Sequence, residues 1–224
     1  MIKIPTKKLN KNFQLHFRHF PFLAHALVLT LLLFICSCGK AYTPEQKTYI
    51  AKVEIKRSEK NKEMKNDPSS PFNYKGKVVF HDLKYFDVDP NFVFKSKLFE
   101  FSPKDTVTIY GTKGEPRKAI RFGFILINYK GKEYKVNVYQ GKTQSGGNYY
   151  SIWFTDKITN IESYGVGRYI DFEKQDNPDY IYTIDFNLAY NPYCAYSPNY
   201  SCAIPTKEDF IPIEITAGEK KFHN

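Results

Sequence analysis

The chain has 224 residues and a formal net charge of +10 at pH 7, with 42% hydrophobic and 25% charged residues. A charge of this size raises the question of nucleic-acid binding. Half of the excess lies in the first 37 residues, where all five charged side chains are basic, and the later lysines are scattered among acidic residues. We therefore expect no nucleic-acid partner, and the 187 residues after residue 37 are enough for one domain with a hydrophobic core.

Residues 1–37 have the pattern of a secretory signal peptide. A basic leader, with Lys3 and Arg18 as its first and last charges, overlaps the start of an apolar run over residues 20–35. That run is shorter than the roughly 20 residues that a membrane-spanning helix needs. Cleavage after residue 37, followed by attachment of a lipid as described next, is therefore the expectation. The alternatives are a plain signal peptide and a single-pass anchor that is never cut.

The residues before Cys38 resemble a bacterial lipobox. Ile35, Cys36 and Ser37 precede it, and a small residue ahead of the cysteine lets a signal peptidase cut in that motif. The resemblance implies that Cys38 carries fatty acyl chains such as palmitate, which attach the protein to a membrane because each buried methylene contributes about 0.8 kcal/mol. Gly39 is not the acidic residue that often retains lipoproteins in the inner membrane. The expected location is the cell envelope, at the outer membrane, with the domain outside the cytoplasm, in the periplasm or on the surface.

A helix is expected to follow a short lipidated tether at residues 38–42. Thr43 suits the capping position, Pro44 suits the first helical position, and Gln46 completes a capping box. The helix should end before Asp67-Pro68, because proline disfavours a helical residue ahead of it.

The two faces of this helix are expected to differ. Tyr49, Ile50 and Val53 fall at helical spacing and predict a face packed on the domain. The charged residues assigned to the other face are Glu54, Lys56, Arg57, Glu59 and Lys60. We interpret that face as solvated, with a contact to anionic lipid head groups as the alternative.

From about residue 77 the hydrophobic period changes from helical to alternating, which predicts β-strands. The clearest expected strands cover residues 78–86, 92–101, 106–111, 119–128, 132–139, 149–154 and 211–217. Two of them should form a hairpin around Tyr129-Lys-Gly131. The chain over residues 43–220 is thus predicted to be a single, mainly β domain: an antiparallel sandwich or barrel-like sheet of about nine strands with an N-terminal helix.

Two cysteines, Cys194 and Cys202, remain in the predicted mature domain. Outside the cytoplasm, cysteines this close in one loop are candidates for a disulfide, which would stabilise the fold by about 2–3 kcal/mol. A metal site would need more ligands, and His81 and His223 are not at a recognisable ligand spacing, so no metal or other cofactor is expected. A free catalytic Cys194 is the remaining alternative, and it would need a base nearby in space.

Several motifs occur in order in the second half of the chain. They are Phe154-Thr-Asp156, Tyr164-Gly-Val-Gly-Arg-Tyr169, Asp185-Phe-Asn-Leu-Ala-Tyr-Asn-Pro-Tyr-Cys194, Tyr200-Ser-Cys202 and Ala217-Gly-Glu219. This order resembles a bacterial family catalogued as domain of unknown function 1684, over about residues 45–220. Cys202 is followed by Ala203, where the family usually has proline. The resemblance implies that some members are lipoproteins, and it implies no known activity.

Polar residues gather in the longest of these motifs. Period two places Asp185 and Asn187 on one face of a strand and apolar residues on the other. Arg168, from the preceding strand, is expected to pair with Asp185. The candidate ligand-binding residues are Arg168, Asp185, Asn187, Tyr190 and Asn191. The alternative is a structural polar network that holds a long loop.

Three smaller features of the motifs have simple interpretations. Gly165 and Gly167 predict a tight connection rather than a phosphate-binding loop, because the segment precedes a strand and not a helix. Asp156 should end a strand and start a turn. Glu219 is expected to be a solvated carboxylate.

These observations predict a lipid-anchored cell-envelope protein that acts as a binding or structural module, with a small molecule or an envelope component as its ligand. The alternative is an envelope enzyme, for instance a hydrolase, that uses a polar cleft around Arg168, Asp185, Asn187 and Cys194. A base and a nucleophile cannot be paired from the sequence, so whether the protein is an enzyme stays open.

Overall fold

The computed structural model describes residues 40–74, 78–143 and 145–223. Contacts divide the chain into residues 1–42 and residues 43–224, and all helices and strands given below belong to the second unit. The predicted signal peptide and Cys38 lie outside the described residues. Within the described ranges, no helix has both the length and the apolar character needed to cross a bilayer.

Helix α2 (Pro44–Asn66) begins with the predicted capping box. The amide of Gln46 donates to the hydroxyl of Thr43 at 3.3 Å, and the amide of Thr43 donates to the side chain of Gln46 at 3.0 Å. These bonds satisfy amides that the first turn of a helix otherwise leaves without partners. The helix ends immediately before Asp67-Pro68, so both predicted ends are confirmed.

The buried face of α2 contains one residue that the sequence placed on the solvated face. Val53, Arg57 and Met64 are its buried residues. The prediction for Arg57 is wrong because its guanidinium has acceptors in the body of the domain, the carbonyls of Phe86 at 2.9 Å and Asn187 at 3.3 Å. A long side chain of this kind can bury its stem where its charged end has such partners.

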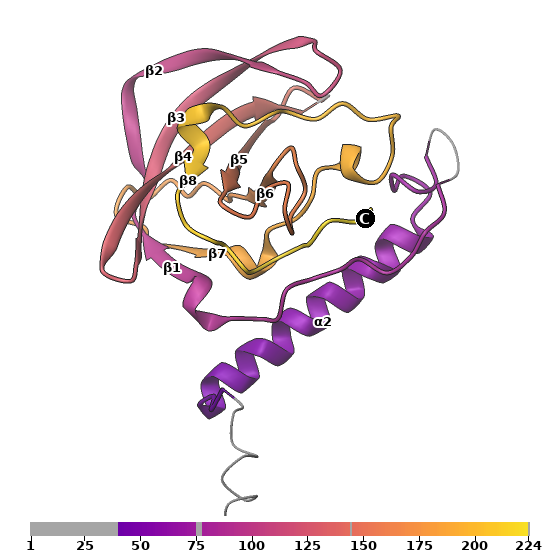
Figure 1. Ribbon diagram of the computed structural model, residues 1–224. Helices are drawn as coiled ribbons and strands as arrows, with labels where there is room; N and C mark the ends of the chain where they lie inside the picture. The colour runs from indigo at the N-terminus through magenta and orange to yellow at the C-terminus, as the bar shows by residue number, and fades with distance from the viewer. Residues whose placement is uncertain (1–39, 75–77, 144, 224) are drawn as a thin grey trace, which may run out of the picture. The chain divides into compact units, whose positions relative to one another are not determined.

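The main sheet is antiparallel and follows the chain order of its first five strands. These are β2 (Phe99–Tyr110), β3 (Pro116–Tyr129), β4 (Lys132–Lys142), β5 (Asn148–Asp156) and β6 (Arg168–Asp171). A short sixth strand, β8 (Phe210–Ile211), pairs in parallel with β5. Figure 1 shows the sheet curled into a half-barrel with α2 beside it. The mainly β, antiparallel class with a leading helix is confirmed, and the described ranges contain eight strands rather than about nine.

A second, two-stranded sheet joins β1 (Val93–Ser96) to β7 (Tyr182–Asp185). The described part of the chain also contains short 3-10 helices: η1 (Pro90–Phe92), η2 (Phe186–Leu188), η3 (Tyr193–Ala195) and η4 (Lys207–Asp209). The one strand predicted over residues 92–101 is therefore two. Between Ser96 and Phe99 the chain leaves its partner β7 and takes β3 instead.

The predicted hairpin is confirmed as β3 and β4. Lys130 and Gly131 are its two turn residues, with φ of 52° and 75°. Two consecutive positive φ values are what a two-residue turn needs to match the twist of the flanking strands.

The middle of the sheet is buried on both sides. On β5, Ile152 and Phe154 belong to the main hydrophobic core, whereas Trp153 belongs to a second cluster with Tyr139 and Ile109. Successive side chains of a strand point to opposite faces, so the two clusters lie on opposite faces of the sheet. Trp153 and Ala203 of the second cluster line the cleft described below.

Residues 78–86 were predicted as a strand, and the structure shows an extended segment instead. The β-pairing of this segment is limited to one isolated antiparallel bridge, between Tyr85 and Glu219. Hydrogen bonds from Phe86 to Gly218 and from Lys220 to Lys84 flank it, at 2.9 and 2.8 Å. The contact with the C-terminal segment is thus too short for a strand.

Residues 211–217 have the predicted alternation of buried and exposed side chains, but pairing stops at Ile211. Polar side chains take the place of a neighbouring strand. Arg168 donates to the carbonyls of Ile215, at 2.8 Å, and Ala217, and the amide of Ile215 donates to Asp156 at 3.2 Å. The prediction of a full strand fails because hydrogen bonds from side chains, rather than a ladder, hold this backbone.

Candidate functional site

Arg168 and Asp156 form a buried ion pair. Their side chains are 1% and 0% exposed, and Nη2 of Arg168 lies 2.8 Å from Oδ2 of Asp156. Burial lowers the pKa of Arg168, and the carboxylate of Asp156 opposes this effect. The predicted pair with Asp185 is therefore wrong. Asp156 does end β5 and start a turn with Thr159, as expected, but it also neutralises Arg168.

Gly167 explains how Arg168 comes to lie against β5. Its φ is 107°, and a Cβ atom there would lie 2.5 Å from the carbonyl oxygen of Phe154. Only glycine combines this backbone conformation with so close an approach. The predicted tight connection is thus confirmed at Gly167, and strand β6 starts at the next residue.

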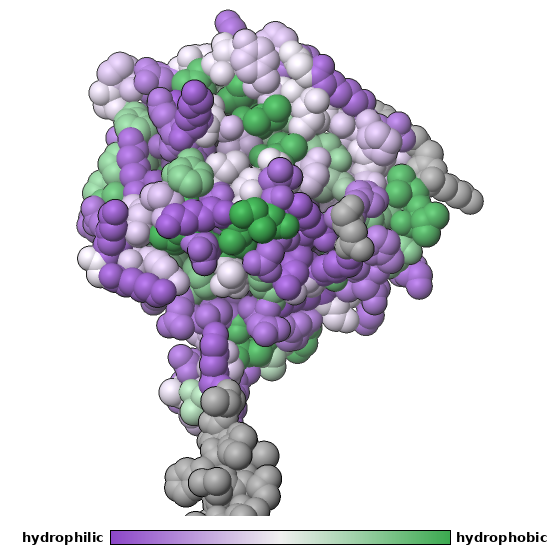
Figure 2. Space-filling model, in the orientation of Figure 1, coloured by the Kyte–Doolittle hydropathy of each residue, from purple (hydrophilic) through white to green (hydrophobic). Residues whose placement is uncertain are grey.

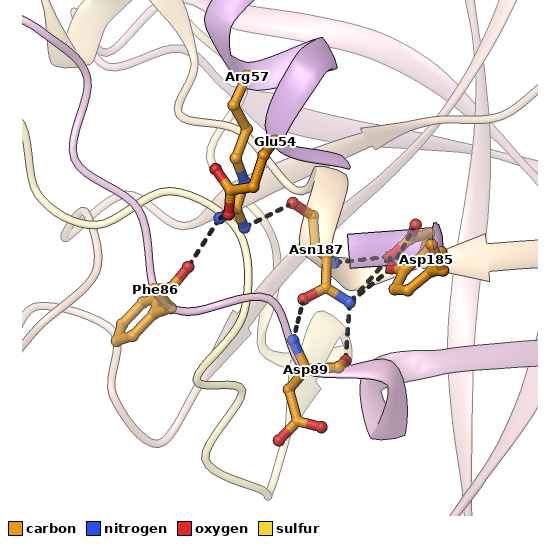
Figure 3. A network of polar contacts seen from close by, with 7 residues as sticks. Glu54, Arg57, Phe86, Asp89, Asp185 and Asn187 are labelled. Carbon is orange, nitrogen blue, oxygen red and sulfur yellow. Dashed lines mark hydrogen bonds and ion pairs between the residues drawn. The ribbon is translucent and has the colours of Figure 1, made fainter. Parts of the chain in front are cut away.

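Asp185 and Asn187 hold helix α2 (Figure 3). The hydroxyl of Tyr49 donates to both carboxylate oxygens of Asp185 at 2.9 Å, and the amide group of Asn187 donates to the same hydroxyl at 2.9 Å. Burial and the nearby carboxylate of Asp185 raise the pKa of Tyr49, so this hydroxyl stays a donor at neutral pH.

Asn187 also joins the segment before η1 to this cluster. Its side chain exchanges two hydrogen bonds with the backbone of Asp89, at 2.8 and 2.9 Å, and its own carbonyl accepts from Arg57. Asn187 is fully buried and lies beyond the end of the strand, so the prediction that it shares one strand face with Asp185 is wrong. The strand ends at Asp185, and the 3-10 turn that follows rotates Asn187 inward.

Glu219 is buried as well, although the sequence suggested a solvated carboxylate. Its side chain is 1% exposed and lies 2.8 Å from Nζ of Lys60 on α2. The backbone amide of Asn191 donates to it at 2.9 Å, and the hydroxyl of Tyr196 donates to the same oxygen. Burial raises the pKa of Tyr196 well above its ordinary value, so the phenol remains protonated and continues to donate to the carboxylate of Glu219.

We call Asp156, Arg168, Asp185, Asn187 and Glu219 the motif network. Each of the five comes from one of the motifs, and each is bonded to backbone groups or to α2. Together they attach the leading helix and the C-terminal segment to the sheet. Their polar atoms are therefore occupied by structural bonds.

A cleft lies beside this network, on the face of β5 and β6 that carries Trp153. Its floor consists of two directly opposed cross-strand pairs, Ser151 with Asp171 and Trp153 with Tyr169. Tyr169 also forms a bridge with Tyr190, which extends the floor beyond the edge of β6. The register of the sheet thus gathers these side chains.

The cleft has a volume of about 750 Å³. One wall is α2, through its charged and apolar residues Lys56, Glu59, Lys60, Glu63 and Met64. The other wall is the segment that contains Tyr193 and residues 200–203. Tyr149 is 41% exposed at the rim, so an aromatic face is open to a ligand there.

Hydrogen bonds fix the aromatic residues of the floor. The hydroxyl of Tyr190 donates to Asp171 at 2.6 Å, and the hydroxyl of Tyr169 donates to the carbonyl of Ala203. Burial raises the pKa of both phenols, so both stay neutral. The floor is therefore rigid and ready for a ring to stack on it.

A second cavity of about 490 Å³ continues the cleft. It shares four lining residues with the first: Arg117, Tyr149, Trp153 and Ala203. Among the residues that the structure describes, the charged side chains around it are Arg117, Lys118 and Lys142, all cationic. The far end of the cleft is consequently positive.

Arg117 is held at the junction of the two cavities. Its guanidinium donates to the carbonyl of Ser201 at 2.8 Å and pairs with Glu115 at 2.5 Å. Hydrogen bonding to Ser201 lowers the pKa of Glu115 to about 2, so this carboxylate is ionised at neutral pH. Arg117 is thus positioned before any ligand arrives.

Among the predicted ligand-binding residues, Tyr190 alone lines this cleft within the described part of the chain. Arg168 and Asn187 are buried in the motif network, and Asn191 is buried with its side chain bonded to the carbonyl of Lys220. Tyr149, Trp153 and Tyr169 line the cleft as well, and they are not among the residues predicted from the sequence. Alternation along each strand could have put them on one face, but nothing in the sequence gives the register that makes them neighbours.

Cys194 and Cys202 lie next to one another, as the disulfide prediction requires, but both thiols are free.

The residues of the hydrolase hypothesis do not line the cleft or the cavity that continues it. Those residues are Arg168, Asp185, Asn187 and Cys194. Over the described ranges, no group of three or more His, Cys, Asp or Glu residues could hold a metal ion.

The side of the molecule shown in Figure 2 has no extended apolar docking face. On the side shown, hydrophobic residues occur in small separate groups among hydrophilic ones. Extended apolar patches are the usual mark of protein or membrane docking. This face does not have that character.

Comparison with known proteins places the chain in a family. None of the curated proteins matches it. An uncharacterized protein of Haloarcula marismortui, solved by NMR, is similar in fold, with 23% sequence identity and a TM-score of 0.57 over 79% of this chain and 96% of that one. A family model described as "Protein of unknown function (DUF1684)" matches residues 78–220. That match covers most of the chain, which therefore belongs to this family.

Proposed function

We propose that the protein is a lipid-anchored binding module of the cell envelope, and that its cleft takes a small organic anion that carries a ring. The anchor part rests on the lipobox-like sequence at Cys38 and on the basic and apolar leader before it. The ligand part rests on the cleft. Neither part requires a catalytic reaction.

One observation carries the ligand proposal: an aromatic cleft of about 750 Å³ continues into a cavity whose charged lining is cationic. Sites for small ligands span about 300–1,000 Å³ and combine aromatic walls with a few polar groups. A ring fits against Tyr149 and Tyr169, and a carboxylate or phosphate fits near Arg117. The mixed charges of α2 suit polar substituents between these two ends.

The motif network argues against the enzyme alternative. A general base and a nucleophile must lie within hydrogen-bonding reach of each other and of the substrate. Arg168 is engaged with Asp156, and Asp185 is engaged with Tyr49. We therefore favour binding over hydrolysis.

The ligand proposal is tested by a thermal-shift screen with matched probes. The panel contains aromatic carboxylates, sugar phosphates and uronic-acid oligosaccharides, each beside its neutral counterpart. We expect at least one anionic probe to raise Tm, and its neutral counterpart to raise it less. Binding is then confirmed by the fluorescence of Trp153, the single tryptophan of the chain, which lies on the cleft floor.

Variants locate the binding. Tyr149→Ala should abolish the shift, and Lys118→Ala combined with Lys142→Ala should weaken the anionic probe by about tenfold, the value of one lost charged contact. Tyr180→Ala is the matched control, because Tyr180 is 43% exposed and lies outside the cleft. A panel without any shift, or a shift that survives Tyr149→Ala, contradicts the ligand proposal.

The anchor is tested separately. Cys38→Ala should release the protein from the membrane fraction of the cell. If fractionation is unchanged, the lipid anchor is wrong, whatever the ligand screen shows.

A further inference from the structure

The two cysteines of the domain form a preorganised pair. Cys194 lies in η3, and its backbone amide donates to Sγ of Cys202 at 3.2 Å. The two side chains also lie close enough for each to shift the pKa of the other. The sulfur of Cys202 thus lies against the backbone of Cys194, which places the two cysteines side by side.

The backbone on each side of the pair is fixed by other elements. Cys202 exchanges two hydrogen bonds with Thr112, in the turn between β2 and β3, at 3.0 and 3.3 Å. The hydroxyl of Tyr164 donates to the carbonyl of Cys194 at 3.2 Å and lies 3.7 Å from its sulfur. The proximity of the cysteines is therefore a property of the fold and not of a free loop.

The electrostatic surroundings separate the two thiols. The hydrogen bond from Cys202 lowers the pKa of Cys194 to about 7, with help from Tyr164. The same bond, together with burial, raises the pKa of Cys202. Near neutral pH the thiolate of Cys194 is therefore populated while Cys202 keeps its proton, which makes a thiolate available for exchange.

The pair is also accessible. Both cysteines are partly exposed, and Cys202 lines the cleft beside Tyr200 and Ser201. Tyr200 and Ser201, which lie between the cysteines, belong to this wall of the cleft. A bond between them would close that segment at its base.

We propose that Cys194 and Cys202 are a reversible dithiol–disulfide pair that exchanges with low-molecular-weight disulfides. The thiolate of Cys194 attacks one sulfur of the incoming disulfide, whose bond breaks and releases one thiolate. Cys202 then gives up its proton and attacks the sulfur of Cys194, which releases the second thiolate. Two electrons pass from the pair to the small disulfide, which leaves as two thiolates. One thiolate takes the proton given up by Cys202, and the other takes a proton from the solvent, to which Cys194 had lost its own.

The test uses glutathione disulfide as the oxidant and the full chain as the protein. Peptide mass spectrometry without reduction follows Cys194 and Cys202 separately from Cys36 and Cys38. We expect the two domain cysteines to become cross-linked, with a loss of about 2 Da for the two hydrogens, and to return to thiols when reduced glutathione is in excess. Closing this short loop should raise Tm by about 5–10 °C.

Single variants keep the test informative. Cys194→Ser and Cys202→Ser should each retain one glutathione on the remaining cysteine, because no second thiol is present to displace it. Circular dichroism checks that both variants fold. Two alkylatable thiols after treatment with excess glutathione disulfide at pH 8, or glutathione on both cysteines without a cross-link, would overturn the proposal. The outcome does not depend on the ligand of the cleft, so the two proposals can fail separately.

Discussion

The motif network and the cleft lie side by side and contain residues of the same motifs, yet they differ in how far their side chains are accessible to a ligand. Asp156, Arg168 and Asn187 are almost fully buried and bonded, whereas Tyr149 at the rim of the cleft is 41% exposed. The polar residues of the most specific sequence pattern thus stabilise the fold through hydrogen bonds and ion pairs within the domain. The residues that a ligand can reach are mostly aromatic side chains on the neighbouring strands.

The comparison also shows how one motif can supply both regions. Arg168 and Tyr169 are consecutive in β6, so they point to opposite faces. Arg168 enters the motif network, and Tyr169 forms the floor of the cleft. Tyr190 and Asn191 are divided in the same way, with Tyr190 lining the cleft and Asn191 buried. The motif therefore links the support of the fold to the shape of the site.

The largest expected loss of stability follows from breaking the buried ion pair of Arg168 and Asp156. Arg168→Met should lower the free energy of unfolding by about 3–5 kcal/mol, because Asp156 then keeps a buried charge without its partner. Denaturation by urea measures this. Lys97→Met is the matched control: Lys97 pairs with Asp179 at 2.7 Å on the surface, and its loss should cost about 1 kcal/mol or less. Equal effects for the two variants would contradict a structural role for Arg168.

A smaller effect is expected at the junction with α2. Asn187→Ala should cost about 2–3 kcal/mol, because the partly buried backbone groups of Asp89 lose the fully buried side chain that they bond to. Urea denaturation of the variant gives this value. Asn66→Ala, at the exposed end of α2, is the control and should change stability by about 0.5 kcal/mol or less. A stability near that of the wild type for Asn187→Ala would show that α2 is attached by other contacts.

The smallest effect on stability is expected in the cleft, where the consequence is for binding. Tyr149→Ala should change the free energy of unfolding by about 1 kcal/mol or less, since its side chain is partly exposed. Its ligand-induced shift in Tm should be lost at the same time. If the variant is as unstable as Arg168→Met, the distinction between the two regions fails.

The cysteine pair allows a prediction on pH. The rate at which iodoacetamide modifies Cys194 should rise with pH and reach half of its maximum near pH 7, because the thiolate is the reactive form. Cys202→Ala removes the hydrogen bond that lowers this pKa, so the midpoint should move toward the ordinary value of 9.0. Peptide mass spectrometry follows the reaction at Cys194 alone. An unchanged midpoint would show that Cys202 does not influence the thiolate.

The sequence predicted the elements whose signals are local. The capping box of α2 and the Lys130–Gly131 hairpin depend on residues close together in the chain, and both are confirmed. The predicted pair of Arg168 with Asp185 failed because a partner across the fold is chosen by topology. Asp156 is the partner of Arg168 because Gly167 allows the start of β6 to lie against the end of β5.

The failures at Arg57 and Glu219 share a physical cause. A charged side chain is expected on the surface unless a partner is provided, and the partners here come from distant segments. Arg57 reaches the carbonyls of Phe86 and Asn187, and Glu219 reaches Lys60. The cleft could not be foreseen for the same reason, since its floor depends on the register between β5 and β6.

The central claim is that side chains of the motif network replace a strand partner for the C-terminal segment. Hydrogen exchange at the amide of Ile215, which donates to Asp156, tests it most directly. We predict protection close to that of the amides in the central strands β3 and β4, because both should exchange only by global unfolding. Exchange at the rate of an exposed loop amide would contradict the account.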